Sequence, residues 1–157
     1  MNVSDASIEQ DASDGEIFFH VTHGLYAPGT HIERGRYGRN LHNEDEETGK
    51  KETVAEELRK RWYRCAPSRL ASTFVLESLK SAMVFRDGCR VGAYIYRVRF
   101  TEPRKKRHRT TWTAFPGPHS GELATSQAVD LWDGKLLYCG DCIEVFAESD
   151  LTVVELV

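Results

Sequence analysis

The chain has 157 residues, of which 40% are hydrophobic and 29% charged, and its formal net charge at pH 7 is −3. A chain of this length fits one domain that buries about 70% of its unfolded surface, so no disulfide or metal is needed to hold the core together. The hydrophobic fraction excludes global disorder, and every apolar run is far shorter than the about 20 residues of a membrane-spanning helix.

The first residues have no basic segment followed by an apolar run, so they lack the pattern of a secretory signal, and we expect a cytoplasmic protein without a membrane partner. Residues 1–15 are polar and acidic and predict a disordered lead before a single domain over residues 16–157. The apolar run at residues 17–22 predicts a buried strand. Residues 34–39, rich in Gly and Arg, predict a loop, and the acidic residues 44–47 predict a second, mobile loop.

A helix is predicted at residues 52–64, where apolar side chains recur at helical spacing, and Pro67 ends it. The apolar side chains of this stripe are Val54, Ala55, Leu58, Trp62 and Cys65. The apolar and β-branched residues 70–76 predict a strand, and Ser78 is placed to cap a short helix at residues 79–86.

Residues 91–101 alternate between apolar and polar side chains and predict the clearest strand of the chain. Residues 109–115 predict its partner strand, so the basic run between them is expected to form the turn of a hairpin. That run contains Arg104, Lys105, Lys106 and Arg107. Its positive charge suits a phosphate-bearing molecule, which makes a nucleic acid a candidate partner.

The C-terminal part predicts one more helix at residues 122–132 and three further strands. The strands are expected at residues 135–138, 143–147 and 151–157. Because helices and strands mix without regular alternation, the sequence predicts an α+β fold with a largely antiparallel split sheet and a few short helices.

The chain has four cysteines, and two of them, Cys139 and Cys142, form a CxxC motif. A zinc ribbon needs a second motif of this kind, whereas Cys65 and Cys89 lie far apart upstream. We therefore expect reduced thiols and assign no metal site, with a zinc module built on the cysteines as the alternative.

Three segments carry polar side chains in a recognisable order. The first strand presents His20 and Thr22, the middle strand begins around Ser72, Thr73 and Phe74, and a late strand opens with Glu144. This order, with the Pro-Ser-Arg-Leu sequence at residues 67–70, resembles the ADP-ribosyltransferase superfamily and small bacterial and phage proteins with its fold. The resemblance extends over residues 16–157 and implies an ADP-ribosyltransferase-like domain.

The resemblance implies a transferase that takes NAD as its substrate and modifies a macromolecule, by default a protein. It implies Glu144, Ser72 and Thr73 as catalytic residues, and His20, Thr22, Tyr37, Arg69 and Phe74 as residues that bind NAD. In this assignment the Glu144 carboxylate stabilises positive charge on the ribose. An aromatic ring, Phe74 or Tyr37, stacks on nicotinamide, and arginines that include Arg69 bind the pyrophosphate.

Such an enzyme requires His20, Ser72 and Glu144 to converge on one cleft large enough for a dinucleotide. A second hypothesis needs no such cleft. It describes a non-catalytic binding or inhibitor protein, of phage or bacterial origin, that docks a protein or a nucleic acid through the basic run.

Overall fold

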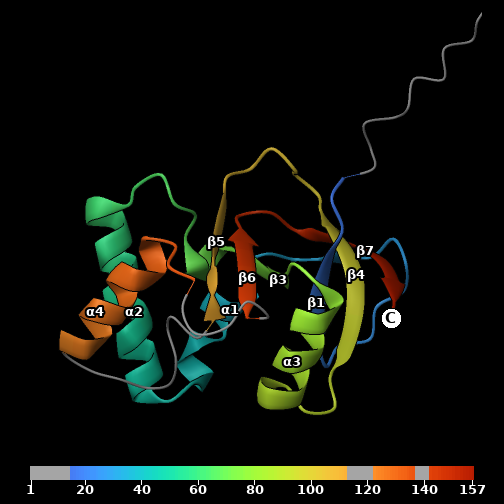
Figure 1. Ribbon diagram of the computed structural model, residues 1–157, viewed down its shortest axis with the longest axis horizontal. Coiled ribbons are helices and arrows are strands. Elements are labelled where there is room, and N and C mark those ends of the chain that lie inside the picture. Colours follow the sequence, from blue (N-terminus) through green and yellow to red (C-terminus); the bar gives the residue numbers. More distant parts are fainter. Residues whose placement is uncertain (1–14, 113–121, 137–141) are drawn as a thin grey trace, which may run out of the picture.

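The computed structural model describes residues 15–112, 122–136 and 142–157. Within these ranges seven strands form one sheet in the order β2-β7-β4-β1-β3-β6-β5 (Figure 1). The strands are β1 (Phe18–Thr22), β2 (His31–Ile32), β3 (Thr73–Leu76), β4 (Tyr94–Phe100), β5 (Arg107–Thr111), β6 (Ile143–Ala147) and β7 (Leu151–Leu156). Each strand pairs antiparallel with its neighbours, so the predicted α+β class with a largely antiparallel sheet is confirmed.

Helices come between the strands along the chain. They are α1 (Arg36–Arg39), α2 (Glu46–Trp62), α3 (Leu79–Cys89) and α4 (Glu122–Trp132), with two 3₁₀ helices, η1 (Leu41–Asn43) and η2 (Arg69–Ala71). Among the described residues, none of these helices combines the length and the apolar character that a membrane span requires.

On one face of the sheet, side chains from different strands pack against one another. Its buried side chains all come from strands: Phe18, Ile32, Val75, Tyr96, Val98, Phe100, Val145, Ala147, Leu151 and Val153. Side chains of β3 and β6 thereby join those of β4 and β7, which lie beyond β1 in the sheet, so the sheet curls around this cluster. The two halves of the sheet meet at β1 and β3, whose register pair is Phe19 opposite Leu76.

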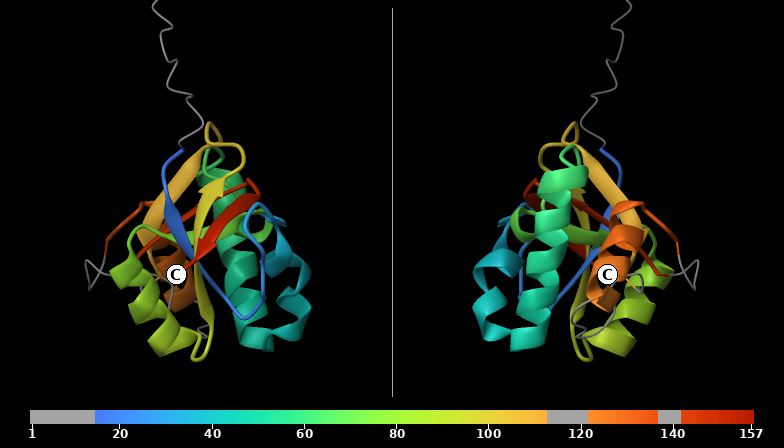
Figure 2. Two further views of the ribbon diagram at one scale, coloured as in Figure 1. Left: turned by 90° about the vertical axis from the view of Figure 1, so that its right-hand side faces the viewer. Right: turned by 90° about the vertical axis from the view of Figure 1, so that its left-hand side faces the viewer.

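Helices cover the opposite face in two groups (Figures 1 and 2). The α2–α4 pair packs on Phe146 of β6, and the indole Nε1 of Trp132 donates a hydrogen bond of 2.9 Å to the carbonyl of Ala55. Helix α3 packs through Ala82 on the other half of the sheet. Strand alternation decides which side chains face the helices, so Phe19, Phe74, Leu76, Glu144 and Phe146 share this helix-covered face.

Side-chain caps fix two of the helix starts. The Asp45 carboxylate accepts a hydrogen bond from the backbone N–H of Thr48 at 2.8 Å, and α2 therefore begins at Glu46. The expected mobile loop at residues 44–47 is thus wrong, because most of it is the capped first turn of α2. Ser78 caps α3 as predicted, but that helix continues to Cys89, three residues beyond its predicted end at residue 86.

The basic run is not the turn of a hairpin. Strand β4 pairs with β1 on one side and β7 on the other, so neither of its edges is open to β5. Strand β5 instead pairs with β6 at the far edge of the sheet. The residues between Phe100 and Arg107 therefore form a connection that crosses from one half of the sheet to the other.

Other differences are local. Residues 69–71 form η2, so β3 begins only at Thr73. Helix α1 forms in residues 34–39, which were expected to be a loop, and β2 and η1 form where no element was predicted. Residues 135 and 136 belong to no strand. The predicted lead at residues 1–14, the end of the predicted strand at 113–115, residues 137 and 138, and Cys139 lie outside the described residues.

Candidate active site around Glu144

The strands that carry the predicted site residues are neighbours in the sheet. Strand β1 carries His20, β3 carries Phe74 and β6 carries Glu144, and the sheet contains them in the order β1-β3-β6. In the register between β3 and β6, Glu144 lies opposite Leu76, the last residue of β3. The Glu144 side chain therefore projects from the helix-covered face.

A buried charge network surrounds the Arg69 guanidinium on this face. Arg69 Nε lies 3.1 Å from Oε2 of Glu52 in α2, and its Nη1 lies 3.5 Å from Oε1 of Glu144. Glu52 is 1% exposed and Glu144 8% exposed, so both carboxylates are largely removed from water. Arg69 is thus shared between two buried carboxylates, and the buried Lys51 is a further cation close to Glu52.

Aromatic rings enclose the network. The Tyr37 hydroxyl donates a hydrogen bond of 3.0 Å to Oε1 of Glu52, and its ring meets Phe74 edge-on with the centroids 5.8 Å apart. The Arg69 guanidinium lies over two rings, 5.0 Å from the centroid of Phe74 and 5.5 Å from that of Phe146. These contacts fix the guanidinium in position through its faces as well as through its N–H groups.

The environment perturbs the ionisation of the network. Burial raises the pKa of Glu144, Arg69 opposes this effect, and the nearby charge of Glu52 adds to it. Burial also raises the pKa of Tyr37, and the Glu52 carboxylate reinforces that shift. Burial works against the charged form of Arg69, but Glu52 and Glu144 together raise its pKa. A carboxylate shifted by desolvation and one charged partner is the electrostatic pattern of a functional site.

A neighbouring hydroxyl has no hydrogen-bond partner. Thr110 of β5 lies directly opposite Glu144 in the β5–β6 register, so their side chains share one face. Its side chain is fully buried, and among the described residues its Oγ1 atom finds no partner. Gln127 of α4 likewise has a buried Oε1 atom without one. A buried hydroxyl left unpaired beside a carboxylate is costly to the fold unless something else binds to it.

The predicted ribose-binding residues lie elsewhere. His20 and Thr22 project from the face opposite to that of Glu144, because Phe18 on the same side of β1 belongs to the strand-only cluster. The His20 Nδ1 atom makes a hydrogen bond of 2.8 Å with the carbonyl of Phe74 and so joins β1 to β3 where the two halves of the sheet meet. Burial lowers the pKa of His20 against the effect of this bond, and Arg36 and Arg90 lower it further. The Thr22 hydroxyl accepts a hydrogen bond from Gly24 N–H at 3.1 Å.

The two predicted catalytic hydroxyls bind backbone carbonyls. Ser72 Oγ donates to the carbonyl of Ser68 at 2.5 Å, and Thr73 Oγ1 donates to that of Ser149 at 2.8 Å. Both residues lie near the start of β3, whereas Glu144 faces its end. The structure therefore brings Tyr37, Arg69 and Phe74 to Glu144 but does not bring His20 or Ser72 there, and the expected convergence of His20, Ser72 and Glu144 is not found.

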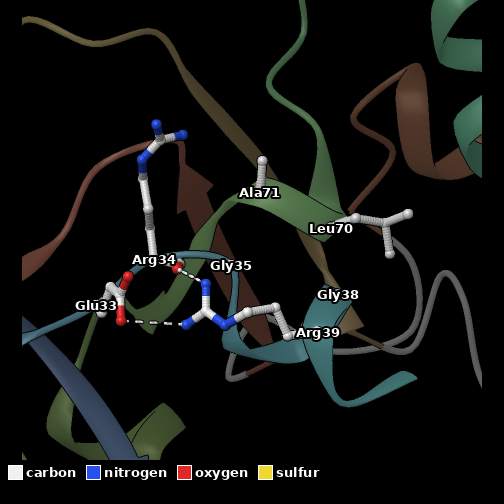
Figure 3. Close-up of a pocket in the computed structure, with 7 residues that line it drawn as sticks. All are labelled: Glu33, Arg34, Gly35, Gly38, Arg39, Leu70 and Ala71. Atoms are coloured by element: carbon white, nitrogen blue, oxygen red, sulfur yellow. Dashed lines mark hydrogen bonds and ion pairs between the residues drawn. The ribbon is translucent and has the colours of Figure 1, made fainter. Parts of the chain in front are cut away.

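A pocket of about 410 Å³ lies next to the network (Figure 3). It is lined by Glu33, Arg34, Gly35, Gly38, Arg39, Leu70 and Ala71. Arg39 pairs with Glu33 at 3.4 Å and donates to the carbonyl of Arg34, while Figure 3 shows the Arg34 side chain pointing away from that pair. Tyr37 and Arg69 come from the same two segments but do not line the pocket, so the pocket and the charge network use different side chains of α1 and η2.

The structure explains the close backbone contact behind this pocket. A Cβ atom at Gly38 would lie 2.2 Å from the carbonyl oxygen of Leu70, so α1 and η2 touch through their main chains. This contact places Tyr37 and Arg69 beside each other, because each residue directly adjoins one of the touching residues. Small residues at positions 35 and 38 are therefore part of how the site is assembled.

The structure describes three of the four cysteines. Cys65 and Cys89 are exposed and Cys142 is buried. In the part of the chain that the structure describes, no three potential metal-binding side chains come together.

Sequence reasoning missed Glu52 and Thr110. Glu52 stands in a helix whose first half is acidic, and this pattern is typical of a solvated helix that complements its dipole. The available signal was its position three residues before Ala55 on the stripe that faces the core. Thr110 fits any strand, and its sequence context contains no signal for the partnerless hydroxyl.

Comparison with known proteins adds no assignment to this geometry. No description of a protein family matches the chain, and no curated protein matches it significantly.

Proposed function

We propose that the protein is an NAD-dependent ADP-ribosyltransferase in which the Glu144 carboxylate acts on the ribose next to nicotinamide. The observation that carries this proposal is the buried Glu144 carboxylate, which shares one arginine with Glu52 and faces a hydroxyl that finds no hydrogen-bond partner among the described residues. The proposal keeps Glu144, Tyr37, Arg69 and Phe74 from the sequence analysis. It assigns His20 and Ser72 to the fold instead of the chemistry.

The reaction needs a fixed negative charge more than it needs an acid. When the bond between the ribose and nicotinamide breaks, the electron pair leaves with the neutral nicotinamide ring and positive charge develops on the ribose. The acceptor then forms the new bond to the ribose and releases its proton to solvent. A buried carboxylate such as Glu144 stabilises this developing charge strongly because little water screens it.

In this proposal the ribose binds beside Glu144 and Thr110. Glu144 accepts hydrogen bonds from sugar hydroxyls, and the Thr110 hydroxyl both donates and accepts. Arg69 favours the charged form of the Glu144 carboxylate against the effect of burial and fixes its orientation, while Glu52 and the two rings fix Arg69. Phe74 supports Arg69 and is already covered by it, so we assign Phe74 to the positioning of Arg69 and not to nicotinamide stacking.

The acceptor is a macromolecule in this proposal, with a protein as the default.

The pocket beside Arg34 has a volume of about 410 Å³, which lies in the range of small-molecule sites. Its two arginines, Arg34 and Arg39, suit the phosphates of NAD, and the pocket shares α1 and η2 with Tyr37 and Arg69.

The test compares the wild type with Glu144→Gln and, as a matched control, Glu155→Gln, whose carboxylate is exposed and pairs with Arg97. Each protein is incubated with labelled NAD, with and without a cell lysate, and nicotinamide release and label transfer are measured. We expect Glu144→Gln to lower turnover by about 100-fold or more, because one charged group in contact with the transition state is lost. NAD binding by calorimetry should stay close to the wild-type value in both variants.

Two outcomes contradict the proposal. One is a wild type that neither binds NAD nor releases nicotinamide. The other is equal activity of Glu144→Gln and the wild type. Thermal unfolding of Glu144→Gln, measured beside the assay, separates a loss of chemistry from a loss of fold.

A further inference from the structure

A second surface, independent of the Glu144 site, lies at the end of the sheet that carries the turn between β6 and β7. Two connections attach to this turn from opposite sides. The backbone N–H of Ser68, in the segment that follows α2, donates a hydrogen bond of 2.8 Å to the Glu148 carboxylate. The backbone N–H of Glu102, in the β4–β5 connection, donates one of 3.0 Å to the Ser149 hydroxyl. Both connections lie along the same edge of the molecule, at the top of Figures 1 and 2.

The β4–β5 connection presents three uncompensated cations. Arg104, Lys105 and Lys106 are exposed, and among the described residues no carboxylate pairs with them. The basic residues that follow are compensated, since Arg107 pairs with Glu16 at 2.7 Å and Arg109 binds Glu77. The basic run therefore divides into paired residues at the start of β5 and unpaired residues in the connection.

Backbone hydrogen bonds and a cation–π contact fix the β4–β5 connection and the residue that follows it. The N–H of Thr101 donates to the carbonyl of Asp150 at 2.9 Å, and that of Lys105 donates to the carbonyl of Glu102 at 3.1 Å. The Arg107 guanidinium lies 5.1 Å from the ring centroids of both Phe18 and Phe100. Because hydrogen bonds fix its backbone, the connection loses little backbone freedom when its cations bind a partner.

The last turn of α2 and the segment that follows it contribute an aromatic residue and two more cations on the other side of the turn. Trp62 is 72% exposed, although it lies two helical turns after Ala55, which is 1% exposed on the core-facing stripe. The helix thus runs past the core, and the expectation that Trp62 belongs to the core is wrong. Arg61 and Arg64 flank the indole and are exposed, and no carboxylate of the described residues pairs with them.

The helix dipole explains why cations occur in the last turn of α2, but it explains neither the exposed indole nor the three cations of the β4–β5 connection. Cations that contact phosphates, together with an exposed aromatic ring on which a base stacks, form the usual surface for single-stranded nucleic acid. Membrane lipid headgroups and acidic proteins also attract cations. Lipid headgroups carry no flat ring, and an acidic protein has an aromatic ring on only some of its residues, whereas every nucleotide combines a phosphate with a base that stacks on an indole.

We propose that this basic end, made of Trp62 with Arg61, Arg64, Arg104, Lys105 and Lys106, binds single-stranded nucleic acid. The cations bind the phosphates, and the Trp62 indole stacks on a base.

The test measures fluorescence anisotropy of a labelled oligouridylate of about 16 nucleotides over a range of salt concentrations. It uses three variants of the full chain. Arg104→Ala with Lys105→Ala and Lys106→Ala removes the connection's cations, Trp62→Ala removes the indole, and Lys50→Ala with Lys80→Ala and Arg90→Ala removes three exposed cations elsewhere as the matched control.

We expect the variant that lacks the three cations of the connection to bind the oligonucleotide at least about tenfold more weakly. The slope of log K against log salt should become less steep by about 2, because three phosphate contacts are lost. Trp62→Ala should weaken binding about fivefold or more, with less change in that slope. The control variant should bind like the wild type.

Several results overturn the proposal. They are equal losses in the connection variant and the control, unchanged binding by Trp62→Ala, and equal or tighter binding of a duplex of the same length. Equal binding of vesicles with anionic lipids also overturns it and assigns the surface to a membrane. Because none of these measurements involves NAD, they leave the proposed transferase activity untouched.

Discussion

Glu52 binds the guanidinium of Arg69 through both of its carboxylate oxygens, with Nε at 3.1 Å from Oε2 and Nη2 at 3.2 Å from Oε1. This pair joins α2 to η2 and holds the one arginine that reaches Glu144. Because both partners are largely buried, the pair is costly to break on one side only.

We therefore expect Glu52→Gln to lower the free energy of unfolding by about 3 kcal/mol, since Arg69 loses its main charge partner while it stays buried. Glu57→Gln on the same helix is the control. Its carboxylate is exposed and lies 4.0 Å from Lys60, so its loss should change stability by less than about 0.5 kcal/mol. Urea denaturation of the two variants measures both values. Equal small effects would mean that the pair does not hold η2 in place.

The perturbed Glu144 carboxyl should make stability depend on pH in a particular direction. Burial raises its pKa in the folded state above the ordinary value of 4.5, so between these two pKa values the folded state binds more protons than the unfolded state. The stability that comes from this group is present below the unfolded pKa and is lost as the pH rises through the folded pKa. The difference in unfolding free energy between the wild type and Glu144→Gln should therefore shift in favour of Glu144→Gln as the pH rises above about 4.5. A pH-independent difference in urea denaturation would contradict the shift.

Parts of the fold could be predicted because their signals are local. Alternation over residues 91–101 predicted β4, and Ser78 predicted the start of α3. Strand partners are not local, since the pairing of β5 depends on which strand edges remain open after β1 and β7 have paired with β4. A turn-like basic run between two strand patterns therefore predicted a hairpin that the sheet does not contain.

In the candidate site, too, some residues could be predicted and others could not. The resemblance implies Tyr37, Arg69, Phe74 and Glu144 as site residues, and Gly38 lets the two backbone segments that carry Tyr37 and Arg69 touch. His20 was named from the same resemblance, yet the alternation of β1 directs it to the opposite face of the sheet. The charge of Glu52 is compensated by a residue 17 positions away, and no sequence spacing indicates such a contact.

The contact between Gly38 and Leu70 gives a further prediction about how the site is assembled. Gly38→Ala places a Cβ atom 2.2 Å from the Leu70 carbonyl oxygen, so the main chains of α1 and η2 must separate and stability should fall by about 1 to 3 kcal/mol. Gly49→Ala in α2 meets nothing within 4 Å and should raise stability by about 0.5 to 1 kcal/mol, since alanine favours helix. Thermal unfolding of the two variants tests both signs. A neutral Gly38→Ala would show that the two segments are free to move apart.

The hydroxyl of Thr110 distinguishes a site from a purely structural network. Because its Oγ1 is buried and finds no partner among the described residues, Thr110→Val should leave stability unchanged or raise it by up to about 1 kcal/mol. Thr73→Val is the matched control, since the Thr73 hydroxyl donates a hydrogen bond of 2.8 Å to the carbonyl of Ser149 and its loss should cost about 1 to 2 kcal/mol. If Oγ1 binds the ribose beside Glu144, Thr110→Val should also weaken NAD binding or turnover about tenfold while the protein stays fully folded. Thermal unfolding and nicotinamide release, measured on the same samples, separate these effects. A Thr110→Val variant with full activity and higher stability would assign the unpaired hydroxyl to the fold alone.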